Sequence, residues 1–222
     1  MDDLILVTWC ERTNVTGVVW LLHACDVFGL DMPCRPERMS RRSYVNEDMM
    51  QSVIGPVFHG LDADTAATGP FPDMARVHDR ADRPAVALLF RDSVTDCFAA
   101  RGWRRGPAFF ASPSCAMIWP LWAAAFPSAK WIIVRRADDD IVRGAMKHGH
   151  MNGPKTPEEW RSQYLDVYKA RFREMVADPG VAVWHVWPEH LADENVMRKM
   201  IDWLGLTWQE SLRMPNGVRR GY

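Results

Sequence analysis

Short, continuous apolar segments limit the folds available to this chain more than any other feature of its sequence. Leu4 to Thr8, Trp131 to Val134 and Val181 to Val186 are such segments. Runs of this length predict strands buried on both faces, which are typical of parallel sheets. Longer segments with helical spacing lie between them, for example Asp138 to His148 and Thr156 to Ala177. This alternation predicts a three-layer α/β/α fold around a mainly parallel sheet of about four or five strands.

Glycine and proline mark the limits of the remaining elements. We predict a short strand at Ala108 to Ala111 and further helices at Val15 to Phe28, Ala85 to Arg101, Cys115 to Phe126 and Asn195 to Leu204. Residues 60–84 are rich in Gly, Pro, Asp and Ala, so this segment is predicted to be a surface loop or lid. A length of 222 residues suits one domain spanning 1–222.

The net charge and the distribution of cysteines limit the kinds of partner and cellular compartment that we expect for the protein. A net charge of -1 gives no overall field to attract nucleic acid or an anionic membrane surface. The five cysteines are scattered without a CxxC pair, which favours free thiols in a reducing cytoplasm. The sequence contains neither a signal segment nor an apolar run long enough for a transmembrane helix. We therefore expect a cytoplasmic protein that acts on a small molecule, without a nucleic-acid or membrane partner.

The loop after the first predicted strand is a candidate anion site. It runs from Cys10 to Gly17 and leads into a predicted helix, whose N-terminal N–H groups favour phosphate or sulfate. Arg12 would supply positive charge, and Thr13 or Thr16 a hydroxyl. The GxxxxGK[ST] pattern of a Walker A loop is absent. An ordinary strand-to-helix turn explains the same residues, so this pattern alone leaves both interpretations open.

A second candidate follows the strand at Trp131 to Val134. Two arginines, Arg135 and Arg136, stand at its carboxyl end, the edge where open α/β sheets bind ligands. The guanidinium of Arg136 would bind a phosphate through two hydrogen bonds, or would instead pair with an acidic residue between 138 and 140. His148-Gly149-His150 lacks a third ligand in its pattern, so we expect no metal site.

Several segments follow one another along the chain in an informative order. They are Arg12 to Thr16, Tyr44 to Asn46, Ala111 to Pro113, Phe126 to Val142, Val183 to Leu191 and Trp203 to Trp208. In kind and order they resemble the motifs of P-loop sulfotransferases, in particular small bacterial and phage-type members. The matches from Phe126 onward are the more specific ones. The resemblance touches most of the chain.

The resemblance implies a fold like that of P-loop nucleoside triphosphate hydrolases. It also implies transfer of the sulfuryl group of 3'-phosphoadenosine-5'-phosphosulfate (PAPS) to a hydroxyl or amine of a small acceptor. Arg136 and the residue at Gly144 would face the 3'-phosphate, and Arg12 would also stabilise the transferred group. The residues implied to hold the 5'-phosphosulfate are Arg12, Thr13, Asn14, Val15, Thr16 and Gly17.

A general base must remove the acceptor proton. Glu47 and Asp48 are the candidates beside the Tyr44 to Asn46 segment, and His59 and His78 are alternatives in the neighbouring loop region.

The chain departs from the family pattern at several positions. Asn14 and Val15 replace a glycine and a threonine, Gly144 replaces a serine, and Val45 and Ser112 stand where acidic residues are common. Each charged oxygen left without a partner would cost about 1–3 kcal/mol. Two hypotheses follow: an active sulfotransferase, or a protein of that fold that binds a partner without catalysis. A P-loop kinase-like phosphotransferase is the third, and the missing Walker lysine and Mg²⁺ carboxylate argue against it.

Overall fold

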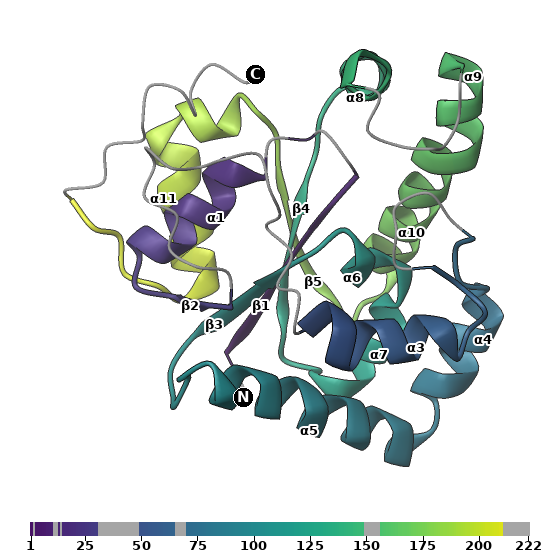
Figure 1. Ribbon diagram of the computed structural model, residues 1–222. Coiled ribbons are helices and arrows are strands. Elements are labelled where there is room, and N and C mark those ends of the chain that lie inside the picture. The colour runs from purple at the N-terminus through teal and green to yellow at the C-terminus, as the bar shows by residue number, and fades with distance from the viewer. Residues whose placement is uncertain are drawn as a thin grey trace.

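A parallel sheet forms the centre of the protein. The computed structural model describes residues 1, 3–10, 13, 15–30, 49–64, 70–148 and 156–210. Within these residues the sheet has five strands in the order β2-β3-β1-β4-β5, and every neighbouring pair is parallel (Figure 1). The strands are β1 (Leu4–Trp9), β2 (Phe28–Gly29), β3 (Ala108–Ala111), β4 (Lys130–Val134) and β5 (Ala182–Val186). The predicted parallel sheet of about four or five strands is confirmed.

Strand β1 shows why its sequence is apolar without alternation. Leu4 and Leu6 belong to the hydrophobic core on one face of the sheet, whereas Ile5 and Val7 belong to the core on the other. All of β1 is buried, because helices cover both faces. Strand β5 differs: it lies at the sheet edge and only Val186 within it is fully buried.

Two helical layers enclose the sheet, as Figure 1 shows. One layer packs in the core that contains Ile5 and Val7, and consists of α1 (Thr16–Ala24) and α11 (Glu194–Leu204). The opposite layer includes η2 (Met50–Ile54), α3 (Gly55–His59), α4 (Met74–Ala81), α5 (Pro84–Ala100), α6 (Ser114–Met117), α7 (Trp119–Ala125) and α10 (Asp166–Ala177). The remaining elements are α8 (Asp138–His148), α9 (Pro157–Trp160), η3 (Arg161–Leu165) and η4 (His190–Ala192). The three-layer α/β/α prediction is therefore confirmed.

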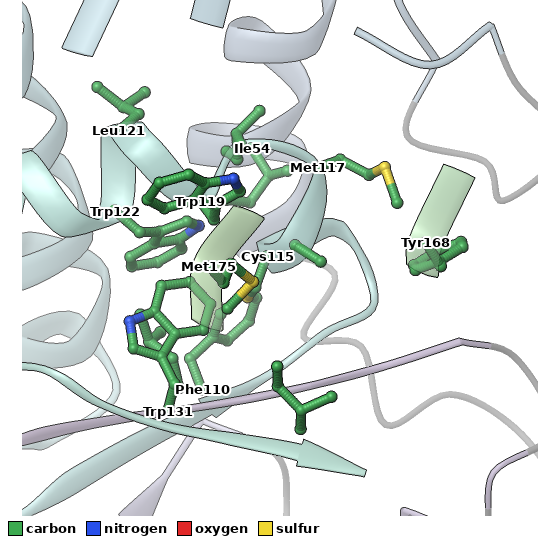
Figure 2. Close-up of a cluster of buried hydrophobic side chains, with 14 of the residues drawn as sticks. Ile54, Phe110, Cys115, Met117, Trp119, Leu121, Trp122, Trp131, Tyr168 and Met175 are labelled. Atoms are coloured by element: carbon green, nitrogen blue, oxygen red, sulfur yellow. The ribbon is translucent and has the colours of Figure 1, made fainter. Parts of the chain in front are cut away.

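Aromatic side chains fill the core of the second layer (Figure 2). The Trp122 indole stacks on Phe110 of β3, with ring centroids 5.8 Å apart, and meets the edge of Phe90 at 4.8 Å. Trp131 of β4 is also fully buried in this core. Aromatic pairs of this kind contribute about 0.5–1.5 kcal/mol beyond the area that they bury. They fix the helices of this layer against β3 and β4.

Two predicted helices have different limits in the structure. The helix expected at Val15 to Phe28 ends at Ala24, because the chain reverses at Asp26 with a φ of 58° and continues into β2. The helix expected at Cys115 to Phe126 is divided into α6 and α7 at Ile118. Pro120 lies in the first turn of α7, where its missing N–H is tolerated, but it cannot continue a helix from α6.

The segment predicted as a loop or lid at 60–84 contains α4, so that prediction is wrong for Met74–Ala81. Asp73 caps the helix by accepting a hydrogen bond from the N–H of Ala75 at 2.8 Å. Val77 packs in the core, and Arg80 donates to the Gly60 carbonyl at 2.6 Å. The loop prediction followed the Gly, Pro, Asp and Ala content of the whole segment and overlooked the helical spacing of Met74 and Val77. Residues 65–69 lie outside the described part of the chain.

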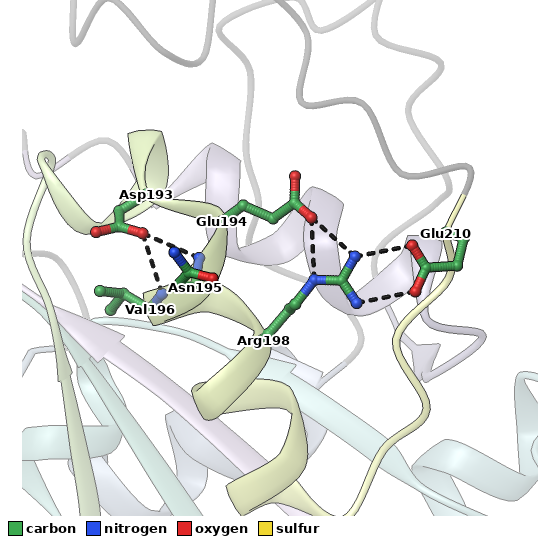
Figure 3. A network of polar contacts seen from close by, with 6 residues as sticks. All are labelled: Asp193, Glu194, Asn195, Val196, Arg198 and Glu210. Carbon is green, nitrogen blue, oxygen red and sulfur yellow. Dashed lines mark hydrogen bonds and ion pairs between the residues drawn. The ribbon is translucent and has the colours of Figure 1, made fainter.

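The far end of the described chain is attached to α11. Gly205 ends this helix with a φ of 78°, as its position predicted. Arg198 donates to Glu194 and to Glu210, both at 2.8 Å, and its guanidinium lies 4.7 Å from the centre of the Trp208 ring (Figure 3). These contacts fold the segment 206–210 back along α11.

Candidate functional site

The candidate site lies at the carboxyl edge of the sheet, between β1 and β4. The last residues of these strands, Trp9 and Val134, are partners in register. From β1 the chain crosses to β2 beyond β3, whereas from β4 it continues to β5 at the opposite edge of the sheet. The two connections therefore diverge at this point. Ligands bind open parallel sheets in the crevice that such a divergence creates.

The connection after β1 presents a buried hydroxyl at this edge. Thr13 is 2% exposed, and within the described part of the chain its Oγ1 has no hydrogen-bond partner. Helix α1 begins three residues later, and its N-cap residue, Val15, provides no side-chain cap. A buried hydroxyl without a partner costs about 1–3 kcal/mol. A phosphate or sulfate oxygen is an acceptor that would satisfy it, so these residues fit an anionic ligand.

Val15 contributes to packing. Its side chain lies in the core between α1 and the sheet, and its carbonyl accepts from Val18 at 3.0 Å and Val19 at 3.1 Å. Thr16 and Gly17 form the first turn of α1. The role of these three residues in ligand binding stays a prediction.

Four of the predicted site residues lie outside the described part of the chain. They are Arg12, Asn14, Glu47 and Asp48, and the Tyr44 to Asn46 segment lies outside it as well.

Arg136 follows β4 and reaches helix α8. Its Nε lies 3.8 Å from Oδ2 of Asp140, and the other oxygen of that carboxylate, Oδ1, accepts from Nη1 of Arg143 at 2.9 Å. The predicted pairing with an acidic residue of 138–140 is thus present, although 3.8 Å is longer than a hydrogen bond. Gly144 lies one turn beyond Asp140, on the same face of α8. Arg136 therefore lies at the edge that Thr13 occupies, and Gly144 follows further along α8.

Arg135 points to the other side of the sheet edge, and the sequence interpretation gave it no role. Its Nε donates to Nδ1 of His185 at 3.1 Å, and its guanidinium lies 4.5 Å from the centre of the Phe172 ring. Burial lowers the pKa of Arg135, which Asp138 partly opposes. Burial and then the charge of Arg135 lower the pKa of His185. Consecutive residues on an extended chain face opposite ways, and this is the signal that would have separated Arg135 from Arg136.

The acidic first turn of α8 attaches this helix to its neighbours. Asp138 accepts from Nζ of Lys169 at 2.7 Å, and Asp139 accepts from Arg161 at 2.8 Å. These ion pairs join α8 to α10 and to η3. They hold the connection after β4 in place beside the sheet edge.

A pair of buried serines follows β3 at the same edge. The N–H of Ser112 donates to the Val7 carbonyl at 3.0 Å, and Ser112 Oγ lies 3.0 Å from Ser114 Oγ. Each hydroxyl is close to Sδ of Met50, at 3.9 and 4.0 Å. The segment that aligned with a family motif at Ala111 to Pro113 thus reaches the site edge. Its hydroxyl, on Ser112, is engaged by the hydroxyl of Ser114.

The histidines considered as bases lie in the helical layer. His59 ends α3 and is exposed. His78 meets the edge of Trp119 with ring centroids 5.6 Å apart, where α4 packs on α7. Neither the structure nor its contacts assign them a chemical role.

Among the residues that the structure describes, no group of three or more His, Cys, Asp or Glu side chains is placed to hold a metal ion. Within the same residues, no helix has the length and apolar character needed to cross a membrane. His150 of the HxH pattern lies outside this part of the chain.

Comparisons with known proteins identify the fold. No family model matches the chain, and no curated protein matches it. Among solved structures, the sulfotransferase STF9 from Mycobacterium avium is similar, with a TM-score of 0.53 at 16% sequence identity. The alignment covers 94% of this chain and 65% of STF9, so the chain spans less than two thirds of that protein's length. The chain has the α/β fold of a sulfotransferase, and at this identity the likeness concerns the fold alone.

Proposed function

We propose that the chain is a PAPS-dependent sulfotransferase that transfers a sulfuryl group to a hydroxyl or amine of a small acceptor. The observation that carries the proposal is Thr13, whose buried hydroxyl lacks a partner at the β1–α1 connection. The proposal is supported by the position of this connection where the chain diverges after β1 and β4, in a fold similar to that of a sulfotransferase. The order of the sequence motifs supports the same function.

The chain's own residues would bind the donor in two places. The connection Arg12 to Gly17 and the N-terminus of α1 would hold the 5'-phosphosulfate, because their N–H and hydroxyl groups favour an anion. Arg136, oriented by Asp140, would hold the 3'-phosphate. When bound, PAPS supplies the sulfuryl group, and 3'-phosphoadenosine-5'-phosphate (PAP) is the product nucleotide.

Catalysis by such a site consists mainly of positioning and charge stabilisation. Arg12 would stabilise the negative charge on the transferred group. Glu47 or Asp48 would remove the acceptor proton. Gly144 offers no hydroxyl to the 3'-phosphate, so affinity there would depend on Arg136.

Calorimetric titration with PAP tests the proposal. We expect micromolar binding to the wild-type chain and at least tenfold weaker binding to Arg136→Gln, equivalent to about 1.4 kcal/mol. Arg143→Gln is the matched control, because Arg143 also pairs with Asp140 but is an exposed α8 side chain. Absence of PAP binding at millimolar nucleotide overturns the proposal. Equal losses in the two variants would show that Arg136 has no particular role.

A second candidate is a non-catalytic binding protein of the same fold. It is favoured by Val15, which replaces a threonine of the family pattern and is buried in the core. Sulfuryl transfer from radiolabelled PAPS to a panel of phenols, alcohols and amines separates the candidates. If the protein binds PAP but transfers the sulfuryl group neither to any acceptor of the panel nor to water, the non-catalytic binding protein is favoured.

A further inference from the structure

The two arginines after β4 contact different helices. Arg136 extends to α8 and Asp140, whereas Arg135 lies over Phe172 of α10. Helices α10 and α1 cover opposite faces of the sheet (Figure 1). Arg135 therefore lies on the side away from α1 and from the connection that contains Thr13.

Several contacts hold Arg135 in place, but none of them balances its positive charge. Its Nε is engaged by His185 at 3.1 Å, and its backbone N–H donates to the Val186 carbonyl at 2.7 Å. The Phe172 ring supports one face of the guanidinium at 4.5 Å. Arginine has further N–H groups on its two Nη atoms, and in the described part of the chain these have no partner.

The nearby acidic side chain is already engaged. Asp138 acts on Arg135 through its charge, but its carboxylate accepts from Nζ of Lys169 at 2.7 Å. Among the described residues, no carboxylate lies within 4.0 Å of the Arg135 guanidinium. A partly buried cation without an ion pair has lost hydration without full compensation. An anionic ligand would provide that compensation.

We infer that Arg135 binds an anionic group on the acceptor substrate. The inference rests on the proposed function, in which the donor lies along the β1–α1 connection and Arg136. Group transfer of this type brings the attacking atom in line with the leaving group, on the side opposite to it. Arg135 lies at the same edge of the sheet, on the face covered by α10, so an acceptor that approaches the donor from that face would meet its guanidinium. The acceptor is therefore a small hydroxyl or amine compound that also carries a carboxylate, phosphate or sulfate.

Three probes of one shape test this inference: benzoate, phenyl phosphate and benzyl alcohol. Each is titrated into the full chain in the presence of saturating PAP, which blocks the donor site. We expect the two anions to bind wild type at least tenfold more tightly than the alcohol. Arg135→Gln should remove that preference, whereas Arg135→Lys should keep part of it because the charge remains. Arg105→Gln, which changes an exposed arginine before β3, should behave as wild type.

Wild-type protein provides a measurement that does not depend on the folding of any variant. Benzoate should shift the ¹⁵N resonance of His185 Nδ1, because this atom accepts from the guanidinium that would bind the anion. An anion that binds at Arg136 or at the protein surface would leave the resonance unchanged. Thermal unfolding of each variant is measured in parallel.

The outcomes separate the two proposals. If PAP binds but the anions bind no better than benzyl alcohol, or do not bind, the role of Arg135 is overturned and the donor site stands. If the anion preference persists in Arg135→Gln, the role of Arg135 is also overturned. If PAP does not bind but an Arg135-dependent preference is found, the sulfotransferase proposal is overturned and Arg135 remains an anion-binding residue.

Discussion

The Nε–H of Arg135 donates to Nδ1 of His185 at 3.1 Å, which requires that this nitrogen carry no hydrogen. His185 is therefore neutral in the folded protein, with its hydrogen on Nε2. Protonation at Nδ1 would replace the hydrogen bond by repulsion between two cations. The protonation state of His185 on β5 therefore affects the position of Arg135, which follows β4.

The first prediction concerns the pH dependence of stability. Burial and the charge of Arg135 lower the pKa of His185 from 6.5, and burial lowers that of His23. Below pH 6.5 the unfolded chain binds these protons while the folded chain does not, so stability falls as the pH falls. Above that value the contribution is fully present. We expect the free energy of unfolding, measured with urea, to decrease from pH 6.5 toward the lowered pKa values.

His185→Gln is the matched variant, since its side-chain oxygen can still accept from Arg135. Its decline in stability with falling pH should be shallower than that of wild type, and His23→Gln should have a similar effect. A wild-type stability that is unchanged below pH 6.5 would contradict the prediction.

The second prediction separates binding from stability at Thr13. Thr13→Val keeps the shape of the side chain but removes the hydroxyl that lacks a partner. The free protein should be equally stable or up to about 1 kcal/mol more stable, because a buried unsatisfied group is removed. PAP should bind about tenfold more weakly, equivalent to 1.4 kcal/mol. Thermal unfolding and calorimetry measure the two effects, and a loss of stability with unchanged PAP affinity would show that the hydroxyl serves the fold.

The sequence predicted strands better than the limits of helices. Segments such as Trp131 to Val134 are apolar throughout because they are buried on both faces. Helix α4 was missed because it has only eight residues and lies in a segment whose Gly, Pro, Asp and Ala content is typical of a loop. Strand β2 was missed because two residues, Phe28–Gly29, carry no periodic signal.

Only part of the candidate site could be predicted from the sequence. Parallel strands bring their carboxyl ends together, so the sequence placed the connections containing Thr13 and Arg136 at one edge, where the structure has them. The contact between Arg135 and His185 joins residues 50 positions apart, and no local pattern predicts it. The roles of the predicted site residues remain predictions.

The third prediction concerns the close approach of β2 to β3. A Cβ added at Gly29 would lie 2.5 Å from the Phe109 ring and 2.8 Å from Cε1 of His23. Both neighbours lie in packed surroundings, so Gly29→Ala should destabilise the protein by about 1–3 kcal/mol. In a double-mutant cycle with Phe109→Leu, the smaller side chain should reduce the cost of the added methyl group. If the two substitutions change the free energy of unfolding in urea additively, the clash at Gly29 is relieved by something other than the Phe109 ring.

The last prediction restores a hydroxyl on α8. Gly144 lies one turn beyond Asp140, and the resembling family has a serine at this position. Gly144→Ser should increase PAP affinity about tenfold, because a hydrogen bond to a charged group contributes about 1.5 kcal/mol. Gly144→Ala is the matched control: both changes should stabilise the helix, by roughly 0.5–1 kcal/mol, but alanine offers no donor to the 3'-phosphate. Calorimetry should therefore find tighter PAP binding for serine alone. Equal affinities in the three proteins would indicate that the 3'-phosphate does not reach this face of α8, and that Arg136 binds something else.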